Sequence, residues 1–215
     1  LSGQTYRGTL VNRRKSGELY HAENTITPMK DGAGNITHLV SVVKDITERR
    51  KREEQEFELS MARVVQQRLY PKASPEVPGY DIAGATFPAG ALCGDYFDYI
   101  PMLQGHLGVV IGDVCGHGLG PSLVMAETRA YLRSYCRTQT NVGKIMDLLN
   151  TTLVEDSEDN NFVTLVFSCL DPAGRTLTYS NAGHPPGFLY RAASGEVERL
   201  DPNGRVLGVL EGAGY

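Results

Sequence analysis

The segment Glu48–Leu69 constrains the fold more than any other part of the chain. The sequence holds 24 Gly and 11 Pro, yet this segment contains neither and is dense in charged residues of both signs. Apolar side chains recur along it at helical spacing: Phe57, Met61, Val64 or Val65, and Leu69. Because Pro71 ends the pattern, we expect a helix, capped by Thr47, that separates the residues before it from those after it.

Two interpretations of this helix follow from the same pattern. The charge density is that of a solvated surface helix, whereas the apolar spacing also suits a connector that pairs with its copy in a second chain. The second interpretation predicts a homodimer that forms through residues 48–70.

The residues before the helix are expected to form a β-meander. Strand-like runs cover Thr5–Asn12, Glu18–Pro28 and Ile36–Ile46, and two polar turns separate them. Three strands with one usable face are marginally stable alone and need a helical partner. We therefore expect residues 1–47 to be the C-terminal part of a domain.

The residues after Pro78 mix strands and helices. Strands are expected over Tyr80–Phe87, Leu107–Ile111, Phe162–Leu170, Thr176–Asn181 and Phe188–Arg191. Helices are expected over Pro121–Cys136 and Val142–Glu155, followed by an acidic loop over Glu155–Asn160. Strands, then two helices, then strands favour an α+β layered domain over a parallel βαβ sheet.

Composition narrows the classes of function. The net charge of −4 argues against a strongly basic nucleic-acid binder, and no apolar run approaches the roughly 20 residues of a membrane-spanning helix. The cysteines form no C-x-x-C pair and indicate free thiols in a reducing compartment: Cys93, Cys115, Cys136 and Cys169. We therefore expect a cytoplasmic protein whose segment here binds neither nucleic acid nor membrane.

Two Gly-Asp segments carry the candidate chemistry. In Gly112–Gly118 an apolar strand runs into Asp113 and then into a glycine-rich loop, and Gly94–Asp98 again places Gly before Asp95. If the two strands pair as a hairpin, both carboxylates meet at one end and favour a hard cation such as Mg²⁺ or Mn²⁺. The plainer alternatives are a glycine-rich turn with a capping Asp and, for Asp98, a structural hydrogen-bonding role.

A third segment, Ser180–Pro186, follows a strand and ends in a rigid Gly-His-Pro-Pro turn. His184 suits binding of a substrate phosphate or proton transfer, and a turn histidine that bonds the backbone is the alternative. His117 and Asn181 join it as candidate substrate-binding residues. A zinc or thiol site is a further alternative, with irregular spacing between its members: Cys93, Cys115, His117 and His184.

These motifs follow one another in a fixed order: Pro88-Ala89, Cys93–Asp98, Gly112–Gly118, Phe162–Thr164 and Asn181–Pro186. In this order they resemble the SpoIIE/RsbU branch of the PPM metal-dependent protein phosphatases over roughly residues 60 to 215. Arg63–Pro71 is similar to the lead-in helix of that branch. Arg13–Arg49 resembles the last three strands of a PAS sensor domain, and its ending is typical of the point where such domains give way to a signalling helix.

The resemblance implies an organisation and a fold. Residues 1–47 would be the C-terminal part of a PAS domain, residues 48–70 a helical signalling linker, and residues 71–215 the phosphatase domain. The implied fold is α+β, with a partial PAS sheet, a connector helix and a PPM-type α/β/β/α sandwich that is incomplete at its C-terminus. The family's later Thr-Asp-Gly motif, which supplies another metal-binding Asp, has no counterpart before Tyr215. We therefore expect this stretch alone to be impaired as an enzyme.

The resemblance also implies a chemistry. Asp95 and Asp113 match the family's metal-ligand aspartates, and the backbone carbonyl of Val114 matches a further metal contact. Two Mn²⁺ or Mg²⁺ ions would activate a bridging water that attacks a phosphoserine or phosphothreonine in line. Cys93 and Cys115 stand where Gly and Ser are common, and we interpret both as small-residue substitutions rather than nucleophiles.

Partners follow from the resemblance as well. The family's substrates are phosphorylated anti-sigma-factor antagonists, which are small STAS-type proteins, and an N-terminal PAS domain would regulate the enzyme through the linker helix. The alternative belongs to another functional class. It is a non-catalytic sensor and scaffold whose phosphatase-like part only binds a partner.

Overall fold

The computed structural model describes residues 4–87, 90, 92–156 and 161–215. The chain divides into two compact units, Leu1–Glu58 and Leu59–Tyr215. The Pro88-Ala89 motif and residues 157–160 of the expected acidic loop lie outside the described residues. Among the helices of the described part, none is long and apolar enough to cross a membrane.

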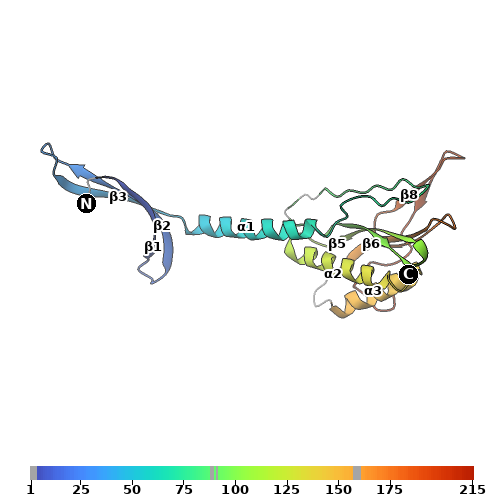
Figure 1. Ribbon diagram of the computed structural model, residues 1–215. Coiled ribbons are helices and arrows are strands. Elements are labelled where there is room, and N and C mark those ends of the chain that lie inside the picture. Colours follow the sequence, from blue (N-terminus) through green and yellow to red (C-terminus); the bar gives the residue numbers. More distant parts are fainter. Residues whose placement is uncertain (1–3, 88–89, 91, 157–160) are drawn as a thin grey trace. The chain divides into compact units, whose positions relative to one another are not determined.

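The first unit contains a three-stranded antiparallel sheet, which confirms the expected meander. Its strands are β1 (Tyr6–Arg13), β2 (Leu19–Lys30) and β3 (Ile36–Asp45), in the order β1-β2-β3 (Figure 1). The turn between β2 and β3 is held by Asp31, whose Oδ1 accepts backbone N–H groups two and four residues later at 3.0 and 2.8 Å. Such contacts are local in sequence, which is why the turn could be predicted.

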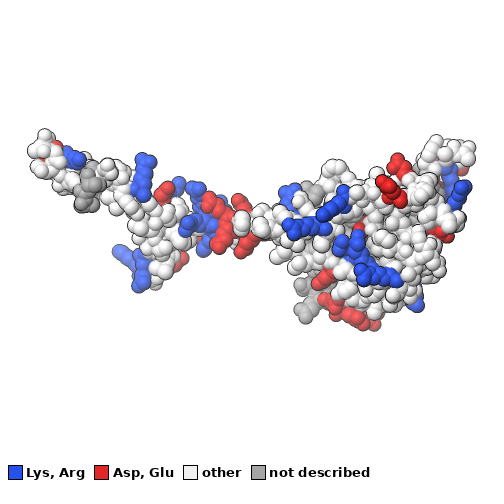
Figure 2. Space-filling model, viewed as in Figure 1, with Lys and Arg blue, Asp and Glu red and all other residues white. Residues whose placement is uncertain are grey.

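Helix α1 (Thr47–Gln67) lies close to where the sequence placed it. Salt bridges between residues three and four positions apart lie in its first half, where Figure 2 shows basic side chains followed by acidic ones. The expected cap is wrong. The Thr47 hydroxyl instead accepts the backbone N–H of His21 at 2.9 Å, and the Asp45 carboxylate accepts the N–H of Thr47 at 3.0 Å.

The second unit is built on a four-stranded antiparallel sheet in the order β4-β5-β6-β7 (Figure 1). The elements are β4 (Tyr96–Pro101), a 3-10 turn (Leu103–Gly105), β5 (Leu107–Val114), α2 (Leu119–Tyr135), α3 (Val142–Asp156), β6 (Val163–Asp171), β7 (Thr176–Ala182), β8 (Gly187–Arg191) and β9 (Glu196–Leu200). This order confirms the α+β class. Strand β9, which pairs with β8, was not expected because most of its residues are charged and exposed.

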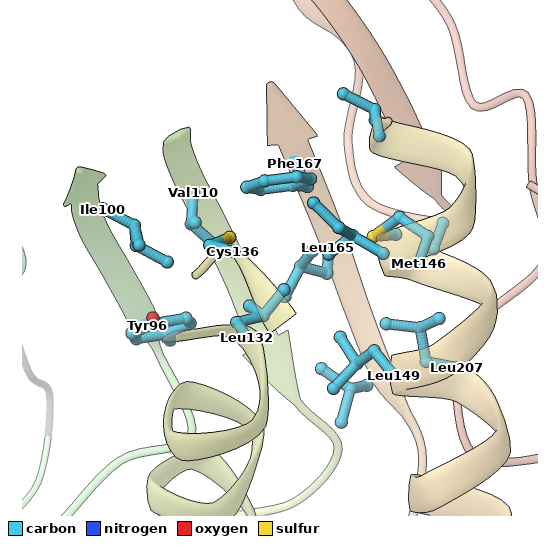
Figure 3. Packing of buried hydrophobic residues seen from close by; sticks show 14 of the residues in the cluster. Tyr96, Ile100, Val110, Leu132, Cys136, Met146, Leu149, Leu165, Phe167 and Leu207 are labelled. Carbon is cyan, nitrogen blue, oxygen red and sulfur yellow. The ribbon is translucent and has the colours of Figure 1, made fainter. Parts of the chain in front are cut away.

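Helices α2 and α3 pack on one face of this sheet and enclose the main core (Figure 3). The side chains that meet there are Tyr96, Ile100, Val110, Leu165 and Phe167 from the sheet, Leu132, Met146 and Leu149 from the helices, and Cys136 directly after α2. All of them are buried. Because side chains alternate along a strand, the neighbours of these sheet residues point to the opposite face.

A smaller apolar cluster lies on that opposite face, formed by Tyr99, Leu107 and Leu170 with Val77, Tyr80 and Ile82 packed against them. The expectation of a strand over Tyr80–Phe87 is therefore wrong. Tyr80 makes only an isolated bridge with Val77, and residues 81–87 have no regular secondary structure. The segment contributes apolar side chains to the sheet face without joining a hydrogen-bonded ladder.

Candidate metal centre

The β4–β5 hairpin brings the two candidate aspartates together, as the sequence predicted. The antiparallel ladder pairs Tyr96 with Gly112, so Asp95, one residue earlier, lies opposite Asp113, one residue later. Residues opposite one another on paired strands share a face. Since Tyr96 points into the helix-covered core, the two carboxylates lie on the other face of the sheet.

Gly94 determines how closely the two strand ends approach. The Val114 N–H donates to the Gly94 carbonyl at 3.3 Å. A Cβ at Gly94 would lie 2.4 Å from the Val114 carbonyl oxygen and 3.1 Å from Oδ1 of Asp113. Any side chain would therefore push the two strands apart, and the glycine before Asp95 is needed to hold this carboxylate against β5.

The carboxylate pair is electrostatically unfavourable by itself. Burial and the charge of Asp95 raise the pKa of Asp113 above its ordinary value, against an opposing effect of His184. A divalent cation would offset this repulsion, and two carboxylates with the Val114 carbonyl are the hard oxygen donors that Mg²⁺ and Mn²⁺ prefer. Within the described ranges, no group of three His, Cys, Asp or Glu side chains is arranged to hold a metal. The oxygen donors that lie together at this end of the hairpin are the carboxylate pair and the Val114 carbonyl.

An open cavity of about 570 Å³ adjoins the aspartates. Asp95, Asp113 and His117 line it together with several glycines, and its volume is in the range of small-ligand sites. Gly116 and Gly118 have φ angles of 96° and 93°, which side-chain-bearing residues rarely adopt. The glycine-rich loop thus turns sharply from the end of β5 into α2 and leaves the carboxylates open to the cavity.

His184 lies near both aspartates and is held by two neighbours. Its Nδ1 is 2.9 Å from Oγ1 of Thr164, and its backbone N–H donates to Oδ1 of Asn181 at 2.8 Å. Thr164 is the ladder partner of Asp113 on β6, which explains how the histidine reaches the site. Burial lowers the pKa of His184, and the charges of Asp113 and Asp95 oppose that shift.

The other two candidate substrate-binding residues differ in exposure. Asn181 is fully buried, and it holds the turn before His184 through its side-chain oxygen. Its backbone carbonyl accepts the N–H groups of Asn203 and Gly204 at 3.1 and 3.0 Å. The Asn181 side chain therefore fixes the backbone of His184. His117, in contrast, is exposed in the loop that lines the cavity.

Asp98 has the structural role rather than the metal role. Its side chain is 0% exposed and accepts hydrogen bonds from two guanidinium nitrogens of Arg133, both at 2.6 Å, and from the Tyr96 hydroxyl at 3.0 Å. These partners lie on the helix-covered face, away from Asp95 and Asp113. The zinc alternative is also wrong, because its four residues form no metal-binding group in the described structure.

Two residues near the end of α1 reach the site and were not expected there. Nε2 of Gln66 donates to the Cys93 carbonyl at 2.7 Å, and Oε1 of the same amide accepts the Cys93 N–H at 3.4 Å. The Tyr70 hydroxyl donates to the Asp95 carbonyl at 2.7 Å. Gln66 belongs to the segment that resembles the family's lead-in helix. No pattern in a single sequence, however, shows that a side chain contacts a backbone 25 residues away.

Comparison with known proteins agrees with this geometry. The SiaA-PP2C domain of Pseudomonas aeruginosa superposes with a TM-score of 0.58 at 16% identity, over 75% of this chain and 65% of that chain. This likeness shows that the second unit has a PP2C-type fold. Metal-dependent phosphatases of the PPM class have this fold. The family model Stage II sporulation protein E (SpoIIE) matches residues 104–215, and the chain belongs to that family. Phosphatases of this type generally use divalent metal ions.

Two curated relatives extend the comparison. The phosphoserine phosphatase RsbU of Bacillus subtilis (strain 168) is 27% identical over 158 residues, which are 74% of this chain and 47% of RsbU. Protein IcfG of Synechocystis sp. is 28% identical over 181 residues, with 72% of this chain and 28% of IcfG covered. The chain thus spans less than half the length of either relative. The resemblance to the SpoIIE/RsbU branch is confirmed, while the PAS interpretation of residues 1–47 stays a prediction.

Proposed function

We propose that this chain carries the catalytic domain of a metal-dependent phosphatase that hydrolyses phosphoserine or phosphothreonine on a protein. The observation that carries the proposal is the hairpin that sets Asp95 opposite Asp113 beside an open cavity. Membership of the SpoIIE family and similarity to a named phosphoserine phosphatase support the same reaction.

The residues of the site have distinct roles in this proposal. Asp95, Asp113 and the Val114 carbonyl would hold two divalent cations, Mn²⁺ or Mg²⁺. Bound there, such ions supply the charge that neutralises phosphoryl oxygens and lowers the pKa of a water nucleophile. His184 is held at Nδ1 by Thr164, which leaves its Nε2 to contact a phosphate oxygen or to carry a proton to the departing hydroxyl.

The proposal is tested by phosphate release from a phosphoserine peptide in the full-length protein, with Mn²⁺ and with a chelator. We expect turnover that requires Mn²⁺ and that Asp113→Asn abolishes, because the variant removes one of the two carboxylates. Asp201→Asn is the matched control, since Asp201 is an exposed carboxylate that forms a salt bridge with Arg199. Full activity of Asp113→Asn would sink the assignment. No release from a folded, Mn²⁺-bound protein would favour the scaffold alternative.

The organisation and partners of the protein are part of the proposal. Residues 1–47 would end a PAS sensor domain, residues 48–70 would form the signalling linker, and residues 71–215 would form the phosphatase domain. The substrate would be a phosphorylated STAS-type signalling protein in the cytoplasm. PAS control is tested by inserting two residues near Gln55, which rotates a helix by about 200°. An unchanged response to the signal would refute the linker's role.

A homodimer through α1 is proposed on the exposure of its apolar side chains. Met61, Val64 and Val65 are 52%, 45% and 59% exposed, although these apolar side chains recur at the spacing of one helix face. Pairing with a second copy would bury them. Sedimentation equilibrium should show a dimer that Met61→Glu dissociates and that Glu56→Gln preserves. A monomeric wild-type protein would contradict this part of the proposal.

A further inference from the structure

The hydroxyl of Tyr70 makes a contact that the proposed function does not use. Tyr70 follows the end of α1, and its hydroxyl donates to the Asp95 carbonyl at 2.7 Å. The same oxygen lies 3.5 Å from Sγ of Cys93. The aromatic ring stacks on Phe97, with ring centroids 5.8 Å apart and planes 22° from parallel. The Tyr70 side chain thus contacts Asp95 and the residues two positions before and after it.

The position of Asp95 explains why such a contact matters. Asp95 stands one residue before β4 begins, and β4 is the edge strand of the described four-stranded sheet, so β5 borders it on one side and no sheet strand borders it on the other. Asp113, its partner, lies within β5 and is held on both sides by the ladders to β4 and β6. Asp95 is therefore the less restrained member of the pair, and the Tyr70 hydroxyl bonds its backbone directly.

The environment of Tyr70 keeps its hydroxyl a hydrogen-bond donor. The ring is partly buried and packs against the main core. A tyrosine phenol is protonated at neutral pH, so the Tyr70 hydroxyl can donate to the Asp95 carbonyl.

We propose that Tyr70 is a positioning residue of the metal centre, which holds the Asp95 backbone so that the carboxylate faces Asp113 and binds a divalent cation more tightly. This inference rests on the proposed function, because it takes the aspartate pair to be a metal site. Preorganised ligands bind a cation without first losing conformational freedom, so the contact acts on metal affinity. One neutral hydrogen bond corresponds to a change of about three- to tenfold in a dissociation constant.

The test compares the wild-type full-length protein with Tyr70→Phe, which keeps the ring on Phe97 and removes only the hydroxyl. Mn²⁺ affinity is measured directly from the electron paramagnetic resonance signal of free Mn²⁺. The matched control is Tyr135→Phe. The Tyr135 hydroxyl makes an equivalent hydrogen bond, 2.6 Å to Oγ1 of Thr152, between helices α2 and α3. Urea unfolding of all three proteins checks that each is folded.

We expect Tyr70→Phe to weaken Mn²⁺ binding by about three- to tenfold and to raise the Mn²⁺ concentration for half-maximal turnover by the same factor. The kcat at saturating Mn²⁺ should stay close to that of the wild type, and Tyr135→Phe should leave Mn²⁺ affinity unchanged. Equal affinities of Tyr70→Phe and the wild type would overturn the proposal. An equal loss in Tyr135→Phe would also overturn it, because the effect would then be one of general stability.

Failure of the proposed function has a different signature. A wild-type protein that binds Mn²⁺ but releases no phosphate refutes the phosphatase assignment, and the affinity comparison still decides the role of Tyr70. A wild-type protein that binds no Mn²⁺ overturns both.

Discussion

Removal of the Asp98 carboxylate should destabilise the second unit without weakening its metal site. Asp98 is fully buried, and its two oxygens accept bonds from Arg133, the Tyr96 hydroxyl and the Tyr99 backbone N–H, while Arg129 lies 3.6 Å away. Asp98→Ala would leave two guanidinium groups without their counter-charge. Loss of one partner of a buried ion pair costs about 3–5 kcal/mol.

The partial exposure of the two arginines reduces the expected loss of unfolding free energy in Asp98→Ala. The Arg133 side chain is 37% exposed and that of Arg129 is 22% exposed, so water can solvate part of the charge that Asp98 leaves behind. We therefore expect Asp98→Ala to lower the free energy of unfolding by about 2–3 kcal/mol. The Mn²⁺ affinity should stay within about twofold of the wild type, because the carboxylate lies on the opposite face from Asp95 and Asp113.

Urea unfolding followed by near-ultraviolet circular dichroism measures this loss, since the chain has 11 Tyr and no Trp and Tyr96 contacts Asp98. The matched control is Asp201→Ala, which removes an ion pair with Arg199 whose partners are both 62% exposed. It should cost less than about 1 kcal/mol. A similarly small loss for Asp98→Ala would refute the structural role. A large fall in Mn²⁺ affinity would instead restore Asp98 as a metal ligand.

Three further predictions concern the metal centre and the thiols. Mn²⁺ at about 100 times its dissociation constant should raise the free energy of unfolding of the wild type by about 2.7 kcal/mol and should not stabilise Asp113→Asn, as measured by urea unfolding. Equal stabilisation of both proteins would show that the metal binds elsewhere. Gly94→Ala should lower the free energy of unfolding by about 1–3 kcal/mol and weaken Mn²⁺ binding, because its Cβ would lie 2.4 Å from a backbone oxygen. Gly120→Ala is the control and should be tolerated, because a Cβ there would meet no atom within 4 Å. A thiol reagent at pH 8 should label the exposed Cys115 first and should react with Cys136 only after unfolding, because burial raises the pKa of the Cys136 thiol to about 12. Labelling of Cys136 in the folded protein would contradict its packing in the core.

The candidate site shows how far residue patterns alone could go. Gly before Asp at two strand ends predicted that Asp95 and Asp113 meet, and the hairpin register confirms this. The pattern favoured a structural role for Asp98 but could not show which groups it bonds. Its role depends on Arg129 and Arg133 of α2, which follow it by 31 and 35 residues and meet it only when the helix packs on the sheet.

The sequence by itself determined the features that depend on residues close together in the chain. The helix α1 follows from a segment without Gly or Pro, and the turn at Asp31 follows from a side chain that bonds its own backbone nearby. Only the tertiary structure decided that residues 81–87 stay outside the sheet, and that the Tyr70 hydroxyl bonds the Asp95 carbonyl. Both depend on which strand edges and backbone groups the fold brings within reach. Contacts between residues far apart in the chain leave no local pattern to read.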